Sequence, residues 1–315
     1  MKAYAIDAFG EQGSVRDLPI PDPEEGRLRL RVTVAGLNPF DVAVLQGHLQ
    51  GRMEHRFPLI PGMDAAGTVD ALGDGVEGFA LGDQVFGSVG KPFLGAGTVA
   101  EFVNVSAGTV AHTPLSLDDE AAAALPTAGV TALVIADALA LSAGQTVVAV
   151  GATGGVGSYF VQLAVQRGAS VVAVCRGENA DYARSLGAAD VIDYMAADVV
   201  DSVRSGYPGG IDAVADMHGD AEEIAKLAAL IPTGGHVASA VGAADVEALA
   251  GRGIEATNVN GLVTTARLET LLDLMAAGSV VAPEVHAHPL ADAAEALATV
   301  GSSHVRGKIV VRVEA

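Results

Sequence analysis

Apolar and polar positions repeat with different periods along this chain, and the first third has the period of strands. From Arg27 to Val34 they alternate strictly, which predicts a half-buried antiparallel strand. Residues 1–7 also predict a strand, and short strands separated by glycines are predicted at 67–70, 83–86 and 98–103. We therefore expect residues up to about 120 to form a β-rich module.

Residues 145–176 show a different pattern. Two apolar, β-branched runs at 145–150 and 170–176 predict buried strands. Between them lie a glycine-rich turn and a helix, in which Val156, Phe160 and Leu163 recur at helical spacing. Strand, turn, helix and strand in this order are typical of the first half of a nucleotide-binding unit.

The rest of the chain extends this unit. Residues 120–140 predict helices interrupted at Pro126 and Gly129. Further strands are expected at 189–194, 211–216, 236–240 and 253–260, with helices at 221–230 and 265–277. Such alternation predicts a doubly wound parallel sheet. A final strand at 308–313 is expected to return to the first module.

The glycine-rich turn is the first candidate site. A turn from strand to helix needs unusual backbone angles, and a pyrophosphate must approach bare main chain beside the N–H groups of the first helical turn. Ala152 replaces the first glycine of the G-x-G-x-x-G pattern, but the turn has the required place between strand and helix. The candidate cofactor-binding residues are Ala152, Thr153, Gly154, Gly155, Val156 and Gly157. The alternative is a glycine-rich turn of an α/β protein without a ligand.

The end of the second strand indicates which dinucleotide binds. An NAD site usually has an acidic residue there, which accepts hydrogen bonds from the ribose hydroxyls. This chain has Cys175, Arg176 and Gly177, and its first acid is Glu178. Because a guanidinium binds a 2′-phosphate and a carboxylate repels it, Arg176 favours NADPH over NADH. The alternative is a solvated arginine at a strand end.

Composition excludes several classes of protein. The 315 residues suit one large domain or two ordinary ones, and half of them are apolar. A net charge of -20 and a pI near 4.6 argue against nucleic acid and anionic membranes as partners. The single cysteine, Cys175, allows no disulfide within the chain and fits a cytoplasmic protein. The first residues lack the apolar core of a signal peptide, and glycine turns interrupt the uncharged stretch between Asp137 and Arg167, so we expect no membrane span.

Several motifs stand together in a familiar order. They are Gly36–Asp41, Pro61–Val69, Leu81–Gly87, the glycine-rich turn and His304–Val310. With them the chain resembles the medium-chain dehydrogenase/reductase superfamily, specifically its zinc-free quinone oxidoreductase branch. The resemblance implies an α/β fold, with a GroES-like β-barrel catalytic domain (1–124 and 263–315) interrupted by a Rossmann domain (125–262). It also implies a homodimer joined through the Rossmann domains, which would cover an otherwise exposed sheet edge.

The resemblance also predicts that no metal is bound. Zinc-dependent members carry a cysteine near Asn38–Asp41 and a histidine at the Met63 position, whereas this chain has Pro39 and Met63. One cysteine cannot build a thiolate zinc site. The pair His286 and His288 is weak evidence for a metal, and a surface or turn pair before a proline is the simpler interpretation. A short-chain reductase is excluded because no tyrosine has a lysine four residues away.

By resemblance, Asn38 and Asp41 are candidate catalytic residues in the loop that holds nicotinamide and substrate, and Asn38 is also a candidate cofactor contact. A simple turn is the alternative. Many relatives carry Tyr or Lys where this chain has Ala43, so the proton would come from water or another group, with His48 as a candidate. Further cofactor contacts near the nicotinamide are expected at Thr127, Thr131, Ser239 and Val241. Tyr194 is expected near the adenine or the 2′-phosphate. Ordinary packing is the alternative for all five.

These observations predict a zinc-independent, NADPH-dependent oxidoreductase that transfers hydride to a quinone or to the activated C=C bond of an α,β-unsaturated carbonyl. Two alternatives stay open. One is an enoyl reductase of polyketide or secondary metabolism, and the other is a non-catalytic NADPH-binding protein similar to the crystallins.

Overall fold

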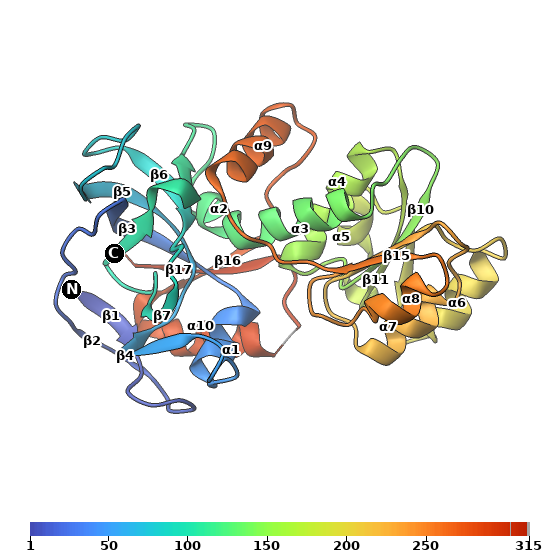
Figure 1. Ribbon diagram of the computed structural model, residues 1–315, viewed down its shortest axis with the longest axis horizontal. Helices are drawn as coiled ribbons and strands as arrows, with labels where there is room; N and C mark the ends of the chain where they lie inside the picture. The colour runs from blue at the N-terminus through green and yellow to red at the C-terminus, as the bar shows by residue number, and fades with distance from the viewer. Residues whose placement is uncertain (303, 314–315) are drawn as a thin grey trace. The chain divides into compact units, whose positions relative to one another are not determined.

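Two compact units make up the chain (Figure 1). The computed structural model describes residues 1–302 and 304–313. Unit 1 comprises Met1–Thr127, Val263–Leu272 and Ala282–Ala315, and unit 2 comprises Ala128–Leu262 and Asp273–Val281. The sequence-based division placed Asp273–Val281 in the first domain instead. It belongs to unit 2 because Gln162 donates a hydrogen bond to the Val281 carbonyl at 3.0 Å and accepts one from the Val281 N–H at 2.8 Å.

Unit 1 is built on a seven-stranded sheet. Its strands follow the order β16-β17-β3-β5-β6-β9. The long strand β3 pairs with β17 over residues 34–37 and with the seventh strand, β8, over residues 27–31. Leu28, Leu30 and Val32 of β3 are buried, whereas the arginines between them are more exposed, as the alternation predicts. The strands are β3 (Arg27–Leu37), β5 (Asp64–Leu72), β6 (Gln84–Ser88), β8 (Phe102–Ser106), β9 (Val110–His112), β16 (Val285–Pro289) and β17 (Lys308–Arg312).

Smaller elements complete unit 1. Two two-stranded sheets pair β1 (Lys2–Ala5) with β2 (Ser14–Asp17), and β4 (Glu54–Ile60) with β7 (Phe93–Ala96). The helical elements are α1 (Pro39–Leu45), η1 (Ala107–Thr109), α2 (Asp119–Ala124), η3 (Leu290–Asp292) and α10 (Ala293–Gly301).

Two predictions for unit 1 were wrong in detail. The strand predicted at 98–103 begins only at Phe102. The pair His286 and His288 was predicted at the surface or in a turn. His286 is exposed at the surface, but both residues lie in strand β16 and not in a turn, because β16 pairs in parallel with β17 along its whole length. The five residues of β16 are too few to show a clear period in the sequence.

Unit 2 is a doubly wound parallel sheet, as predicted. Its six strands follow the order β12-β11-β10-β13-β14-β15, and every pair is parallel. The strand order reverses between β10 and β13, and in such sheets ligands bind at the carboxyl ends of the strands beside this reversal. The strands are β10 (Thr146–Val150), β11 (Ser170–Cys175), β12 (Asp190–Asp193), β13 (Ala213–Asp216), β14 (His236–Ser239) and β15 (Glu255–Asn258).

Helices accompany this sheet (Figure 1). They are α3 (Pro126–Ala138), α4 (Gly155–Gln166), η2 (Gly177–Asn179), α5 (Ala180–Ser185), α6 (Val199–Gly206), α7 (Ala221–Ala228) and α8 (Val246–Ala250). The first two residues of α3 belong to unit 1, and α9 (Thr265–Ala276) also has residues in both units. The predicted interruption at Gly129 was wrong, because α3 continues through this buried glycine. Pro126 does mark a boundary, since it begins α3 where its missing N–H costs nothing. Of the helices in the described residues, none has the length and apolar character to cross a membrane.

Candidate functional site

The glycine-rich turn of unit 2 leaves a stretch of main chain bare. β10 ends at Val150, and α4 begins at Gly155. At Gly157 a side chain is sterically excluded, since a Cβ atom there would overlap the Gly151 carbonyl and lie 2.7 Å from the backbone of Ala152. Gly154 differs, because a Cβ atom there would meet only the Gly151 oxygen, at 3.6 Å. Packing within the protein does not require glycine at 154. The missing side chain instead leaves the backbone accessible to a ligand.

The same turn offers hydrogen-bond donors. Gly154 is the N-cap of α4, and the first N–H groups of a helix have no partner within it. Together with the helix dipole they attract an anion. Of the six predicted turn residues, 152–154 lie between the strand and the helix, and 155–157 form the first turn of α4. Ala152 and Thr153 are buried. The arrangement fits the pyrophosphate of a dinucleotide.

Two predicted residues meet at the end of the next strands. Arg176 follows β11, Tyr194 follows β12, and the arginine Nε donates to the tyrosine hydroxyl at 3.1 Å. The Arg176 guanidinium also lies 3.8 Å from the carboxylate of Glu178. Sequence reasoning missed Asp193, whose carboxylate lies against Gly177. The signal for Asp193 in the sequence is an acid at the end of the strand that follows β11 and pairs with it in parallel.

A buried carboxylate joins the loops after β13 and β14. Asp216 accepts hydrogen bonds from the N–H groups of His218 at 3.0 Å and Gly219 at 2.6 Å, and from the Ser239 hydroxyl at 2.5 Å. The Ser239 oxygen in turn accepts from the N–H groups of Val241 and Ala243. The single donor and both lone pairs of the Ser239 hydroxyl are therefore used within the protein. Ser239 thus orders the loop that carries the predicted residue Val241, which is 53% exposed.

Thr131 packs inside unit 2. It lies in α3 and is 9% exposed, and a Cβ atom at Gly261 would overlap its hydroxyl oxygen. The missing side chain at Gly261 therefore makes room for Thr131.

In unit 1, a second cluster of buried polar groups surrounds Asn38. The Asn38 N–H donates to the carboxylate of Asp41 at 2.8 Å, and the N–H of Gly62 also bonds this carboxylate. Asp41 is 1% exposed. It therefore ties the loop that begins α1 to the loop before β5.

The Asn38 side chain lies between opposite charges. Its Nδ2 donates to Asp64 at 2.9 Å, and its Oδ1 accepts from the ammonium of Lys308 at 2.6 Å. A carboxylate only accepts and an ammonium only donates, so this amide orientation is the only one that satisfies both. Asp64 also accepts from the hydroxyl of Thr127 at 2.7 Å and from its N–H at 3.1 Å.

We call Asn38, Asp41, Asp64, Thr127 and Lys308 the Asn38 network. Three of these residues were predicted to contact nicotinamide or substrate, whereas Asp64 and Lys308 were not. Both missed residues lie inside sequence motifs that had been used only to identify the family. The available signal is a charged residue at the first position of each strand, directly before an apolar run.

Burial sets the protonation of the Asn38 network. It raises the pKa of Asp41 to about 7, although the Asn38 N–H bond and the charge of Lys308 oppose the rise. Burial likewise raises the pKa of Asp64 and lowers that of Lys308, while the attraction between these two charges opposes both shifts. Near neutral pH the carboxyl of Asp41 is therefore partly protonated.

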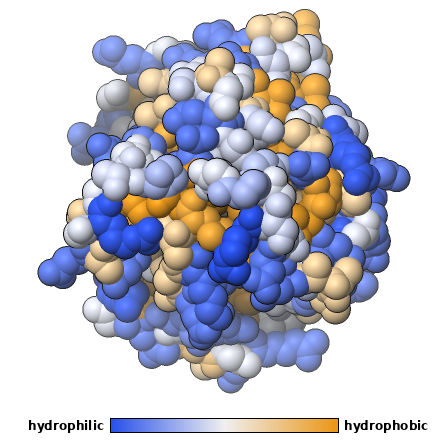
Figure 2. Space-filling view, turned by 90° about the vertical axis from the view of Figure 1, so that its right-hand side faces the viewer, coloured by the Kyte–Doolittle hydropathy of each residue, from blue (hydrophilic) through white to orange (hydrophobic). Residues whose placement is uncertain are grey.

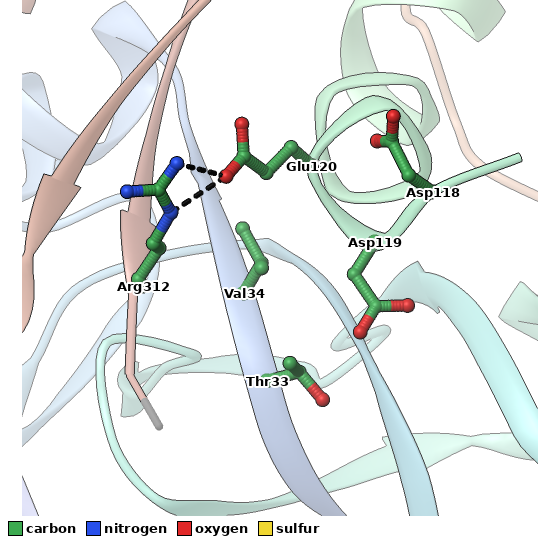
Figure 3. A pocket seen from close by; sticks show the side chains of 6 residues that line it. All are labelled: Thr33, Val34, Asp118, Asp119, Glu120 and Arg312. Carbon is green, nitrogen blue, oxygen red and sulfur yellow. Dashed lines mark hydrogen bonds and ion pairs between the residues drawn. The ribbon is translucent and has the colours of Figure 1, made fainter. Parts of the chain in front are cut away.

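Other candidates do not form sites. In the described residues, no three or more His, Cys, Asp or Glu side chains are placed to hold a metal ion. Figure 3 shows a surface depression of unit 1 lined by Thr33, Val34, Asp118, Asp119, Glu120 and Arg312. Its acids belong to the start of α2, where Asp118 accepts from the Ala121 N–H, and Arg312 donates to Glu120 at 2.6 Å. Asp118 caps the first turn of α2, and all three acidic side chains interact favourably with the positive end of the helix dipole.

Comparisons with known proteins cover residues of both units. The model of the alcohol dehydrogenase GroES-like domain matches residues 24–115, and that of the zinc-binding dehydrogenases matches residues 186–311. A chloroplast envelope quinone oxidoreductase homolog of Arabidopsis thaliana is 36% identical over 56% of this chain and 55% of its own length. An NADPH-dependent alkenal/one oxidoreductase of the same plant is 29% identical over 99% of this chain and 79% of its own length.

A solved structure matches throughout. The alcohol dehydrogenase superfamily protein from Novosphingobium aromaticivorans is 30% identical, with a TM-score of 0.88 over the full length of both chains. This chain spans only 55 to 63% of the length of several relatives. Matching models for both parts and this full-length likeness nevertheless establish the family. The chain belongs to the medium-chain dehydrogenase/reductase superfamily, in its quinone oxidoreductase branch.

Proposed function

We propose that this protein is an NADPH-dependent reductase that delivers hydride to a quinone or to the C=C bond of an α,β-unsaturated carbonyl. The observation that carries this proposal is the bare main chain at Gly154, where the protein has room for a side chain and lacks one. The relatives named for quinones and for NADPH-dependent alkenal/one reduction support the same substrates.

The residues of unit 2 fit the cofactor. The turn 152–157 would hold the pyrophosphate, and Arg176 with Tyr194 would hold the adenosine 2′-phosphate. Val241 lies exposed on the loop that Asp216 and Ser239 order, where we place a contact with the nicotinamide. The bound nicotinamide supplies the hydride, and the protein's part is to orient it and to exclude water.

The Asn38 network supplies the polar groups of unit 1. After its bonds to Asp64 and Lys308, the Asn38 amide retains one N–H and one lone pair. We assign these two to the carbonyl of the substrate or to the carboxamide of the cofactor. Asp41 and Thr127 then act mainly by positioning, since Asp41 bonds the N–H groups of Asn38 and Gly62, and Thr127 bonds Asp64. Because Ala43 cannot donate a proton, the proton comes from water or from the exposed His48.

Turnover measurements test the proposal against its alternatives. NADPH oxidation should be followed with p-benzoquinones, with simple enones, and with enoyl thioesters, which an enoyl reductase would prefer. Reduction of quinones or enones is expected. Turnover of enoyl thioesters alone would favour the enoyl reductase, whereas tight NADPH binding without any turnover would favour the crystallin-like alternative.

We also infer that catalysis needs no metal. Pro39 and Met63 stand where zinc-dependent relatives have ligands, and Asn38 is engaged with Asp64 and Lys308. Full activity in EDTA is expected. Stoichiometric zinc in a washed sample, with activity lost on its removal, would contradict the inference.

We further propose a homodimer joined through the parallel sheets of unit 2. In the described residues β15 pairs only with β14, so one edge of β15 is available to a second copy. Figure 2, which views the molecule from the right-hand side of Figure 1, shows apolar side chains exposed between polar ones. Light scattering should give twice the monomer mass, and a monomer at micromolar concentration would contradict the proposal.

The single buried cysteine fits a cytoplasmic location.

A further inference from the structure

We propose that Lys308 is a positioning residue for hydride transfer, which acts by fixing the direction of the Asn38 amide. The inference rests on the proposed function and extends it to a residue of the motif His304–Val310.

The first observation is the burial of the Lys308 charge. Lys308 is 4% exposed, and its ammonium lies 2.6 Å from both the Leu37 carbonyl and Asn38 Oδ1. Removing an ammonium from water costs several kcal/mol, and replacing a buried pair of opposite charges such as Lys308 and Asp64 by apolar side chains of similar volume is often neutral or stabilising. Fold stability alone therefore does not account for this pair of charges.

The second observation concerns what Lys308 adds to β17. The backbone ladder between β17 and β3 runs from the pair Ile309 and Leu37 to the pair Arg312 and Val34. This ladder joins the two strands without help from the ammonium. Besides a bond to the Leu37 carbonyl and a charge opposite to that of Asp64, the ammonium provides a donor at Asn38 Oδ1.

The third observation is the symmetry of an amide. The two ends of an Asn side chain have nearly the same shape, so packing hardly distinguishes one orientation from its flip. Asp64 attracts the N–H₂ end, and Lys308 attracts the oxygen end. With both present, the remaining N–H and lone pair of Asn38 have fixed places, as a polarised carbonyl requires.

A double-mutant cycle separates positioning from plain structural support. The variants are Lys308→Gln, Asn38→Ala and the double variant, measured for kcat, acceptor KM and NADPH affinity. Lys308→Gln should lower kcat by about ten- to hundredfold and change NADPH affinity by less than about twofold. In the Asn38→Ala background the same change should cost less than about twofold, because the group through which Lys308 acts is gone.

Arg312→Gln is the matched control. It removes the same charge from the same strand, but Arg312 pairs with Glu120 at the surface. We expect unchanged kcat. Lys308→Arg should retain more activity than Lys308→Gln, since it keeps the charge and a donor.

The outcomes are distinct. Equal losses from Lys308→Gln in both backgrounds would overturn the role of Lys308 and leave the proposed function standing. Absence of turnover in the wild type with every acceptor would overturn the proposed function and this role with it. If Lys308→Gln does not fold, the cycle is run with Lys308→Arg, whose smaller loss must likewise vanish in the Asn38→Ala background.

Discussion

The hydroxyl of Ser239 donates to the buried carboxylate of Asp216 at 2.5 Å, across the carboxyl ends of two adjacent parallel strands. Each partner also accepts two backbone N–H groups, from the loops that follow β13 and β14. One contact therefore holds both loops at the edge of the sheet where ligands of this fold bind. Neither side chain is exposed, so both act through the loops.

Ser239→Ala should loosen these loops. It removes one donor and leaves the buried N–H of Ala243 and the partly buried N–H of Val241 without their acceptor, which costs on the order of 1–3 kcal/mol of unfolding free energy. We expect NADPH affinity to fall by about three- to tenfold as the loops lose order. Urea unfolding and a fluorescence titration measure the two effects. Ser202→Ala, which removes a hydroxyl bonded within the exposed turn of α6, is the control, and equal effects of the two changes would contradict the role of Ser239.

Two glycines of the turn should respond differently to alanine. Gly154 has φ -77° and only an ordinary contact at its Cβ position, and it is the N-cap of α4, so the gain from restricting the unfolded chain and the loss of a glycine N-cap offset each other and Gly154→Ala should change stability by less than about 1 kcal/mol. The new methyl group would occupy the place of the pyrophosphate, and NADPH affinity should fall more than about tenfold. Gly157→Ala should instead destabilise the protein by about 1–3 kcal/mol, because its methyl group overlaps the backbone.

Thermal unfolding and NADPH titration of the two variants decide this prediction. Unchanged cofactor affinity in a stable Gly154→Ala variant would mean that no phosphate approaches the turn. The proposed function would then lose the observation that carries it.

The buried carboxyl of Asp41 predicts a pH dependence of stability. Its pKa is about 7 in the folded protein against 3.8 for an ordinary Asp side chain, so the folded state holds a proton that the unfolded state releases between these values. Unfolding free energy should therefore fall as pH rises from about 4 to about 7. The full effect is on the order of 4 kcal/mol at 1.4 kcal/mol per pKa unit.

Asp41→Asn isolates this effect from those of other groups. The amide is neutral throughout, so the difference in unfolding free energy between variant and wild type should grow in the variant's favour from pH 5 to pH 8. Urea unfolding at four or five pH values measures it. Parallel curves for the two proteins would show that Asp41 titrates normally.

Sequence reasoning located the elements of the site better than their contacts. The turn 152–157 was predictable because glycine spacing between a strand and a helix reports backbone geometry directly. The roles of Asp64, Lys308 and Asp216 were not, since each depends on partners far along the chain, 270 residues apart for Lys308 and Asn38. Hydrophobic periodicity says which face of a strand is buried, but not which charge is buried with it. The prediction for Ser239 has the same limit. Its position at a strand end was predicted correctly, but the sequence did not show that its hydroxyl bonds Asp216 within the protein.

The choice between NADPH and NADH depends on the surroundings of Arg176. Its Nε is held by Tyr194, which leaves the other guanidinium donors for a 2′-phosphate, although Glu178 lies 3.8 Å away. Each charge-assisted bond contributes roughly 1.5–3 kcal/mol, which corresponds to about a ten- to hundredfold preference for NADPH. Arg176→Ala should weaken NADPH by this factor and leave NADH nearly unchanged. Arg176→Asp should weaken NADPH further, because its carboxylate repels the phosphate and offers the ribose an acceptor.

Two further variants make this experiment specific. Glu178→Gln should strengthen NADPH binding by removing a charge that competes for Arg176. Arg184→Ala removes an exposed guanidinium paired with Asp181 on α5, so it controls for the general loss of positive charge in a protein of net charge -20. Titration of both cofactors into all four variants gives the comparison. Equal affinity of the wild type for NADH and NADPH would mean that Arg176 serves only Tyr194 and the solvent, and that acids such as Asp193 decide the cofactor instead.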